Sequence, residues 1–341
     1  MKKTISTVLT EELAMASAVL AEAAAAIERV FDGIKTGSAL DCPALRSTLP
    51  SLVERLLDHH ASMTTVILLN QMRRVDGELF EHAVNACVLA LVMGKEQGLD
   101  ATALEHLGLG AILHDVGQIR LPHNLRRKSG AYTVQEEKLT RLHPELGAMI
   151  VSRVQPHDEV CRRIVIEHHE LLDGSGYPNR LAGTEISPLS QIVGLVDRYE
   201  ALTSGRGGRP AMFPVEAVRE LYQLGLSHRY DQELVERMIH CLGVYPVGSL
   251  VELNTGERGV VIAQNRTERL KPTIKLIWES SGQPYPMPWI VDLAARSADG
   301  PQRSIQCVLD PAVEQVNMAA CIEGLAGATE ATARQGSEGA P

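Results

Sequence analysis

Apolar residues recur at helical spacing over most of the first 240 residues of the chain. Alanines and leucines are mixed with spaced glutamates from residue 11 to about residue 35, and a second amphipathic stretch covers residues 52–72. The segment "DGELFEHAVNACVLALVMGKEQGL" then repeats its apolar positions at the spacing of helical turns, and Gly98 stands where this helix should end. The pattern predicts N-terminal helices followed by one largely helical unit between about residues 75 and 242.

The period of the pattern changes after "VYPVG". The runs "SLVEL", "GVVIAQ" and "TIKLIW" are short and rich in β-branched residues, and "NTGERG" supplies a turn between the first two. Residues 247 to about 295 therefore predict a small antiparallel barrel or sheet. Just before it, "RYDQELVERMIHCLG" predicts a helix with Asp231 as its N-cap and Gly243 beyond its end.

These changes of pattern divide the chain into four regions. We expect an N-terminal helical region at 1–72, a helical domain at 73–243, a small β domain at 244–300 and an extension at 301–341 that is largely disordered. The extension ends in small and polar residues, which bury too little apolar surface to fold. The predicted fold class is mainly α, with N-terminal helices, a helical core and a small C-terminal antiparallel β barrel or sheet. Regulation and dimerisation both stay open for the N-terminal region.

Charge and cysteine content exclude several classes of protein. The chain has 33 Lys and Arg against 42 Asp and Glu, and this negative charge disfavours binding to polymeric nucleic acid or anionic membranes. Its 6 cysteines lie far apart without a C-x-x-C pair, as expected for buried, reduced thiols of a cytoplasmic protein. Glu11 and Glu12 interrupt the apolar N-terminus, so we expect neither export nor a membrane span.

Histidines and carboxylates recur in a series through the predicted helical domain. Glu78 and His82 stand four residues apart, so both project from one face of a helix. His114 and Asp115 follow the apolar run "LGLGAIL", a placement typical of a helix end. The remaining members are His143, His168, His169 and Asp197. Five imidazoles and three carboxylates, without thiolates, suit iron, manganese, nickel or cobalt better than structural zinc.

Taken one at a time, these residues have ordinary explanations. A His-Asp dipeptide arises easily by chance, and His157-Asp158, in a polar and loop-like context after Pro156, is an example for which we expect no function. His59-His60 is interpreted as the surface of a helix. Whether these residues form a metal site must therefore be judged from their order and context in the sequence.

The series matches a known family in order and spacing. "HDVGQ" is followed by "HPELG", "HHELLDGSGYP" and "VDRYEALTSGR". Together these motifs resemble the HD-GYP family, a branch of the HD phosphohydrolase superfamily, from about residue 78 to residue 206. The resemblance implies an HD-type helical bundle that holds two or three divalent metal ions and hydrolyses cyclic di-GMP, a bacterial second messenger.

The resemblance also implies roles for individual residues. The implied metal ligands are Glu78, His82, His114, Asp115, His143, His168, His169 and Asp197. Asp115 is the implied bridge between two ions, and a glutamate at position 78 accompanies a third ion in the family. His114, Asp115 and Tyr177 are the implied catalytic residues, while Gln118, Tyr177 and Arg206 are the implied substrate contacts.

The expected function is that of a cyclic di-GMP phosphodiesterase of the cytoplasm. Two metal ions neutralise the phosphodiester anion and generate the hydroxide that attacks it, which gives linear pGpG, with GMP left open as a further product. Iron or manganese is the expected metal. Because imidazoles bind metal only when neutral, we predict metal loss and inactivation below about pH 6.

The positions around the substrate depart from the family pattern. Gln118 stands where the family has a lysine that supports the substrate phosphate, Glu200 replaces an aspartate, and "RGGR" at 206–209 replaces Arg-Pro-Tyr-Arg. Two alternatives therefore stay open. One is a weakly active or inactive cyclic di-GMP binding or scaffold protein that acts through partners such as diguanylate cyclase (GGDEF) proteins, and the other is a phosphohydrolase for another nucleotide. A homodimer also stays open.

Overall fold

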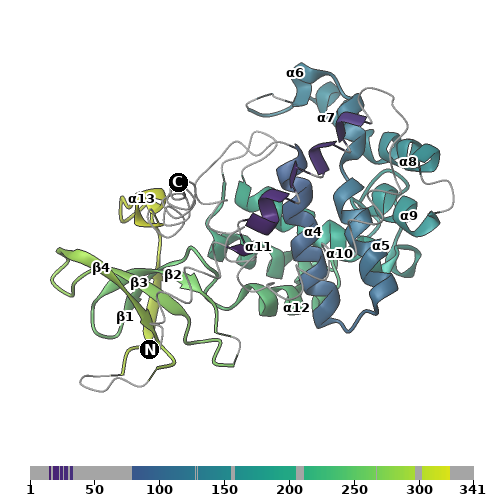
Figure 1. Cartoon of the computed structure of the whole chain (residues 1–341). Helices are drawn as coiled ribbons and strands as arrows, with labels where there is room; N and C mark the ends of the chain where they lie inside the picture. The colour runs from purple at the N-terminus through teal and green to yellow at the C-terminus, as the bar shows by residue number, and fades with distance from the viewer. Residues whose placement is uncertain are drawn as a thin grey trace, which may run out of the picture.

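A body of helices and a five-stranded sheet form the part of the chain that the structure describes (Figure 1). The computed structural model describes residues 15–33 except 17, 23, 26 and 30, and residues 79–126, 128, 130–154, 158–204, 211–265, 267–295 and 302–322. Among the sequence predictions, those on Glu78, Arg206, His59-His60, the stretch at 52–72 and the tail after residue 322 lie outside the described residues.

The described part of the chain contains a series of helices from residue 79 to residue 242. They are α4 (Leu79–Glu96), α5 (Ala101–Leu113), η1 (Val116–Arg120), α6 (His123–Arg126), α7 (Val134–Thr140), α8 (His143–Val154), α9 (Glu159–Glu167), η2 (Gly183–Glu185), α10 (Pro188–Ser204), α11 (Pro214–Leu226) and α12 (Gln232–Leu242). Helical pieces between residues 15 and 33 place Ile27 and Phe31 in the same buried core. None of the described helices combines the length and the apolar character needed to cross a membrane.

The helix ends follow the local signals of the sequence. Gly98, just after α4, has a φ of 74°, and Gly243, just after α12, has a φ of 89°, a backbone conformation that glycine adopts at little cost. Asp231 caps α12 by accepting a hydrogen bond from the N–H of Leu234. The predicted cap and both predicted helix ends are thus confirmed.

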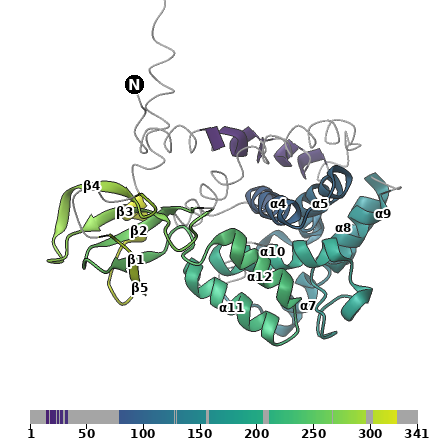
Figure 2. The ribbon, with the colours of Figure 1, turned by 90° about the horizontal axis from the view of Figure 1, so that it is seen from below.

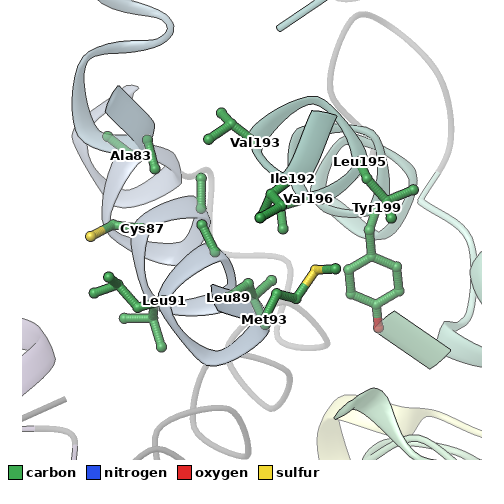
Figure 3. Packing of buried hydrophobic residues seen from close by; sticks show 14 of the residues in the cluster. Ala83, Cys87, Leu89, Leu91, Met93, Ile192, Val193, Leu195, Val196 and Tyr199 are labelled. Atoms are coloured by element: carbon green, nitrogen blue, oxygen red, sulfur yellow. The ribbon is translucent and has the colours of Figure 1, made fainter. Parts of the chain in front are cut away.

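A buried apolar core joins α4 to α10 (Figure 3). Leu91 and Met93 of α4, and Ile192, Val196 and Tyr199 of α10, are all almost completely buried, and Met93 points toward the Tyr199 ring. Burial of one such side chain contributes about 1.5–3 kcal/mol. The core therefore fixes the relative position of these two helices and of the polar side chains that they carry.

The sheet is antiparallel throughout, with the order β4-β3-β2-β1-β5. Its strands are β1 (Leu250–Leu253), β2 (Arg258–Ala263), β3 (Thr273–Trp278), β4 (Pro284–Asp292) and β5 (Ile305–Leu309), and a short helix, α13 (Met318–Ile322), follows. In both views the sheet lies to one side of the helical body, next to α11 and α12 (Figures 1 and 2).

Three expectations about this region need correction. The sheet is open, because its edges β4 and β5 do not pair with each other, so the barrel alternative is wrong. β5 pairs with β1 although it lies beyond residue 300, in the stretch that the sequence assigns to an extension outside the β unit. As part of an edge strand, Cys307 is an exposed thiol and not a buried one. The prediction of a mainly α chain with a C-terminal antiparallel sheet is confirmed.

Candidate metal centre

Seven of the eight candidate metal ligands are described, and their ligand atoms converge at one place. One group consists of His82, His114, Asp115 and Asp197, and the other of Asp115, His143, His168 and His169. Within each group the ligand atoms all lie within 4.8 Å of one another. The seven side chains come from α4, the α5–η1 turn, the start of α8, the end of α9 and the middle of α10. The eighth candidate, Glu78, lies outside the described residues.

Two glycines let the backbones that carry these ligands come into contact. A Cβ atom at Gly117 would stand 2.0 Å from the carbonyl oxygen of His143, and one at Gly194 would stand 2.3 Å from that of His168. Real Cβ atoms do not come so close to oxygen. The glycine of "HDVG" and the glycine of "IVGLVD" are therefore needed to bring η1 against α8 and α10 against the end of α9.

Asp115 faces both groups, one carboxylate oxygen toward each. Its Oδ2 atom lies 3.4 Å from His82 Nε2 and 3.6 Å from His114 Nε2. Its Oδ1 atom lies 3.2 Å from His143 Nε2. Asp197 makes a similar division, with Oδ1 at 3.1 Å from His82 Nε2 and Oδ2 at 3.8 Å from His169 Nδ1. Asp115 thus has the geometry of a carboxylate shared between two cations.

The hydrogen bonds of the imidazoles turn their lone pairs inward. The Nδ1 atoms of His114, His143 and His168 each donate to the carbonyl oxygen three residues earlier, at 2.7, 2.6 and 2.8 Å. Because a carbonyl oxygen only accepts a hydrogen bond, Nδ1 carries the proton. In the neutral ring Nε2 then has a free lone pair that can bind a metal ion. A bond of this kind from the second ring nitrogen is the usual support of a metal-binding histidine.

Lone pairs that face each other at close range need a cation or a proton between them. His143 Nε2 lies 3.2 Å from His168 Nε2, and His82 Nε2 lies 3.0 Å from His114 Nε2. Burial lowers the pKa of both His143 and His168, which disfavours the proton. The donor set therefore fits two divalent cations, one in each group.

The loop after α9 brings Tyr177 against the second group. Its ring stacks on that of His169, with 4.7 Å between the centroids and 28° between the planes. Buried Glu170 holds the loop, because its carboxylate accepts from the N–H groups of Asn179 at 2.6 Å and Leu181 at 3.0 Å. Burial, followed by the negative charges of Asp197 and Asp115, raises the pKa of the Tyr177 phenol. Tyr177 therefore stays protonated at neutral pH and can donate a hydrogen bond.

The remaining predicted residues have different placements. Gln118 lies in η1, where its N–H bonds the carbonyl of Asp115 at 2.9 Å, and its side chain is half-buried. Arg206 lies outside the described residues. Asp158 caps α9 by accepting from the N–H of Cys161 at 2.9 Å, so the carboxylate of the second His-Asp dipeptide has a structural use.

Comparison with known proteins identifies the type of domain. The model of the HD domain matches residues 55–234, and a model described as "KOW domain associated with HD domain" matches residues 250–298. The chain belongs to the HD domain family. Its "HD" and "GSGYP" motifs place it in the HD-GYP branch.

Among the relatives of this chain are proteins that, by their names, hydrolyse cyclic dinucleotides. The chain is 28% identical over 286 residues to "Cyclic di-GMP phosphodiesterase PA4108" of Pseudomonas aeruginosa, which covers 84% of this chain and 68% of the relative. It is 31% identical over 143 residues to "3'3'-cGAMP-specific phosphodiesterase 2" of Vibrio cholerae, which covers 42% of this chain and 27% of the relative.

A solved structure shares the fold. It is that of "Bd1817, a HDG"Y"P protein from Bdellovibrio bacteriovorus", with a TM-score of 0.52 over 65% of this chain and 70% of that chain. The sequence identity of 19% makes this a likeness of fold alone. The HD-type helical core expected from the motifs is thereby confirmed.

Glu200 supports the candidate ligand His82, a role that the sequence did not reveal. His82 Nδ1 lies 2.5 Å from Glu200 Oε2, and the Asn85 amide donates to Glu200 Oε1 at 3.2 Å. The sequence offered two signals, because Glu200 replaces an aspartate of the family pattern and lies three residues after Asp197 on the same helix. The buried carboxylate keeps the proton of His82 on Nδ1 and thereby directs the Nε2 lone pair toward Asp115 and Asp197.

We expect Glu200→Ala to weaken metal binding about 10- to 100-fold at the His82 group, the usual effect of removing a carboxylate that supports a metal-bound histidine. Glu200→Gln should have a smaller effect, because its amide oxygen still accepts from His82. Metal titration followed by calorimetry measures both affinities. Equal losses in the two variants would contradict the role of the hydrogen bond and indicate a general effect on packing.

Stability of the metal-free protein should fall as the pH is lowered below about 6.5, the ordinary pKa of histidine. Burial is the main cause that lowers the pKa of His143 and His168, and it lowers that of His169 to about 3. Between pH 6.5 and 3 the unfolded chain therefore binds more protons than the folded one, and acid favours unfolding. Each such imidazole contributes up to about 1.4 kcal/mol per pH unit.

Urea unfolding of the metal-free protein between pH 4 and pH 8 measures this dependence. Saturating Mn²⁺ should raise the free energy of unfolding at neutral pH, and this gain should disappear in acid as protons displace the ion. A free energy of unfolding that is flat across this range would contradict the prediction that the imidazoles are neutral.

Proposed function

We propose that this protein is a metal-dependent phosphodiesterase that hydrolyses cyclic di-GMP to linear pGpG. The observation that carries the proposal is the position of Asp115, whose two oxygens face two separate groups of buried ligands. The name of the Pseudomonas aeruginosa relative supplies the substrate class. Because the chain spans only part of its relatives, substrate and activity are inferred for the region that they share.

The residues of the site have complementary tasks in this reaction. Two divalent ions, when bound, would offset the charge of the phosphodiester and activate water for attack. His82, His114 and Asp197 would hold one ion, and His143, His168 and His169 the other, with Asp115 shared. We assign iron or manganese to these positions, since nitrogen and oxygen donors without thiolate suit both. Glu78, whose position the structure does not describe, is the candidate ligand for a third ion.

Tyr177 is the candidate for contact with the substrate. Its raised pKa keeps the phenol protonated, and its ring lies against that of His169. A phenol in this place can donate a hydrogen bond to a phosphate oxygen, and it is a poor base. We propose that residues 73–243 form the unit that performs the hydrolysis, with the sheet after it as a separate unit.

A chromatographic assay tests the function directly. Protein purified without oxygen and loaded with Fe²⁺ or Mn²⁺ is incubated with cyclic di-GMP, and the products are separated by anion exchange, with Asp115→Ala as the control. Formation of pGpG by the unaltered protein alone supports the proposal. Binding of cyclic di-GMP without product would instead favour a scaffold protein.

A second substrate, 3'3'-cGAMP, belongs in the same assay. One relative is named for this dinucleotide, and Gln118 departs from the family lysine beside the phosphate. The metal ions would contact the phosphodiester that both dinucleotides share. Their ligands therefore do not select the base. The ratio of the two kcat/KM values decides the specificity.

A further inference from the structure

A guanidinium group lies over the tyrosine that faces the metal centre. Arg141 is the C-cap residue of α7, which leads directly into α8 and its first residue His143 (Figure 1). Its Cζ atom lies 5.0 Å from the centroid of the Tyr177 ring. The sequence analysis did not single out Arg141, because it stands outside the catalytic motifs.

The Tyr177 ring contacts both Arg141 and a candidate metal ligand. The Arg141 Cζ atom lies 5.0 Å from its centroid, and the His169 ring stacks on it at 4.7 Å between centroids. The Tyr177 ring also makes a T-shaped contact with the His143 ring, at 6.4 Å between centroids. Stacking on an aromatic face restrains a flexible arginine side chain. The positive charge is thus held at the border of the site.

The Arg141 guanidinium can bind more than its present partner. The Glu137 carboxylate accepts from Nη2 at 2.7 Å, whereas a guanidinium carries five N–H donors in a planar fork. About half of the Arg141 side chain is exposed to solvent, at 50%. A phosphate can therefore approach it, and two parallel N–H bonds to phosphate oxygens are the preferred arginine geometry.

One positive charge of the family pattern is missing from this chain. Gln118 is uncharged, whereas the family pattern has a lysine at this position. A cyclic dinucleotide carries two phosphodiester anions, and the metal ligands surround only one reacting phosphate. A fixed cation beside Tyr177 would offset the loss at Gln118 for the reacting phosphate or would bind the second one.

We propose that Arg141 binds a phosphate of the substrate and replaces the charge that Gln118 does not provide. This inference rests on the proposed phosphodiesterase function. Arg141 would hold the anion in the bound state, so its removal acts on KM more than on kcat. Glu137 competes with the substrate for the same guanidinium.

A purely structural role for Arg141 gives different expectations. Arg141 forms an i,i+4 ion pair with Glu137 at the end of a helix, and exposed pairs of this kind contribute only about 0.3–0.5 kcal/mol. Arg237 and Glu233 form the same type of pair on α12, a helix that carries none of the candidate ligands. Arg237→Ala is therefore a matched control for loss of an exposed ion pair.

Steady-state kinetics of the Mn²⁺-loaded full chain test the proposal. We expect Arg141→Ala to raise the KM for cyclic di-GMP roughly ten- to a hundredfold, the effect of one charge-assisted contact. Arg141→Lys should restore much of the affinity, and Glu137→Gln should lower KM. Arg237→Ala should leave KM unchanged. The same KM for Arg141→Ala and Arg237→Ala would overturn the proposal.

Two further measurements separate this proposal from the function on which it rests. Bis(4-nitrophenyl) phosphate is a diester without bases, so its KM reports on Arg141 even if cyclic di-GMP is not the substrate. Calorimetric titration of the Mn²⁺-loaded protein with inorganic phosphate measures anion binding without any turnover. In both, a shift with Arg141→Ala and none with Arg237→Ala supports the phosphate contact. Identical results for the two variants refute it.

Discussion

Asp115→Ala should leave the protein folded but unable to hold its pair of metal ions, with phosphodiesterase activity lowered at least about a thousandfold. Asp115 is the residue that both ligand groups share, so its loss removes one donor from each. Metal ions stabilise a phosphoryl transition state by several kcal/mol, and about 4 kcal/mol corresponds to a thousandfold in rate. The metal-to-protein ratio after gel filtration, together with kcat/KM, measures the effect.

The chain provides a matched control for this variant in its second His-Asp dipeptide. Asp158→Ala removes the N-cap of α9 and should cost about 1 kcal/mol of stability, while metal content stays normal. Reduced stability with full metal content for Asp158→Ala, and loss of metal content for Asp115→Ala, is the expected pattern. Full metal content in Asp115→Ala would contradict the shared role of this carboxylate.

Much of the fold and of the candidate site could be predicted because both depend on local signals. Apolar periodicity defined α4, and caps and glycines defined where helices such as α12 begin and end. His114 and His168 are the C-cap residues of α5 and α9. Both therefore stand at helix ends next to the site, as the order of the motifs predicted. The chemistry of the series then suggested metal ions.

The features that escaped prediction depend on contacts between distant residues. Glu200 approaches His82 across 118 positions of the chain, and no local pattern shows such a contact. β5 is only five residues long and pairs with β1 across a long gap in the sequence. The local sequence therefore did not show that this segment belongs to the sheet. Arg141 stands at the end of the surface helix α7, and only the tertiary fold brings the Tyr177 ring of a distant loop against it. Tertiary packing decided each of these.

Gly194→Ala should damage both stability and metal binding, although the added atom is a single methyl carbon. The new Cβ would stand 2.3 Å from the carbonyl oxygen of His168, whereas a normal C···O contact is about 3.3 Å or more. α10 and the end of α9 must therefore move apart by about 1 Å, while metal–ligand distances tolerate only about 0.2 Å. Asp197 lies one helical turn after Gly194, so it moves away from His169 and His82 with the helix.

Gly108→Ala is the control that separates this collision from the general effect of adding a methyl group to a helical glycine. Gly108 lies inside α5, where a Cβ would meet Leu91 Cδ2 at 3.4 Å, an ordinary contact. Its replacement should stabilise the protein by about 0.5–1 kcal/mol, since alanine is the better helix former. At Gly194 the same gain opposes an overpacking cost of about 1–3 kcal/mol, so stability should fall by up to about 2 kcal/mol.

Thermal unfolding and Mn²⁺ titration of the two variants distinguish the two effects. A drop in metal affinity for Gly194→Ala, with unchanged affinity for Gly108→Ala, would show that the approach of α10 to α9 sets the coordination distances. Normal metal affinity in Gly194→Ala would instead mean that the centre adjusts to a 1 Å displacement, which rigid packing of α10 against α4 should prevent. On this expectation the core drawn in Figure 3 sets how accurately the candidate ligands are held, although none of its labelled side chains is itself a candidate ligand.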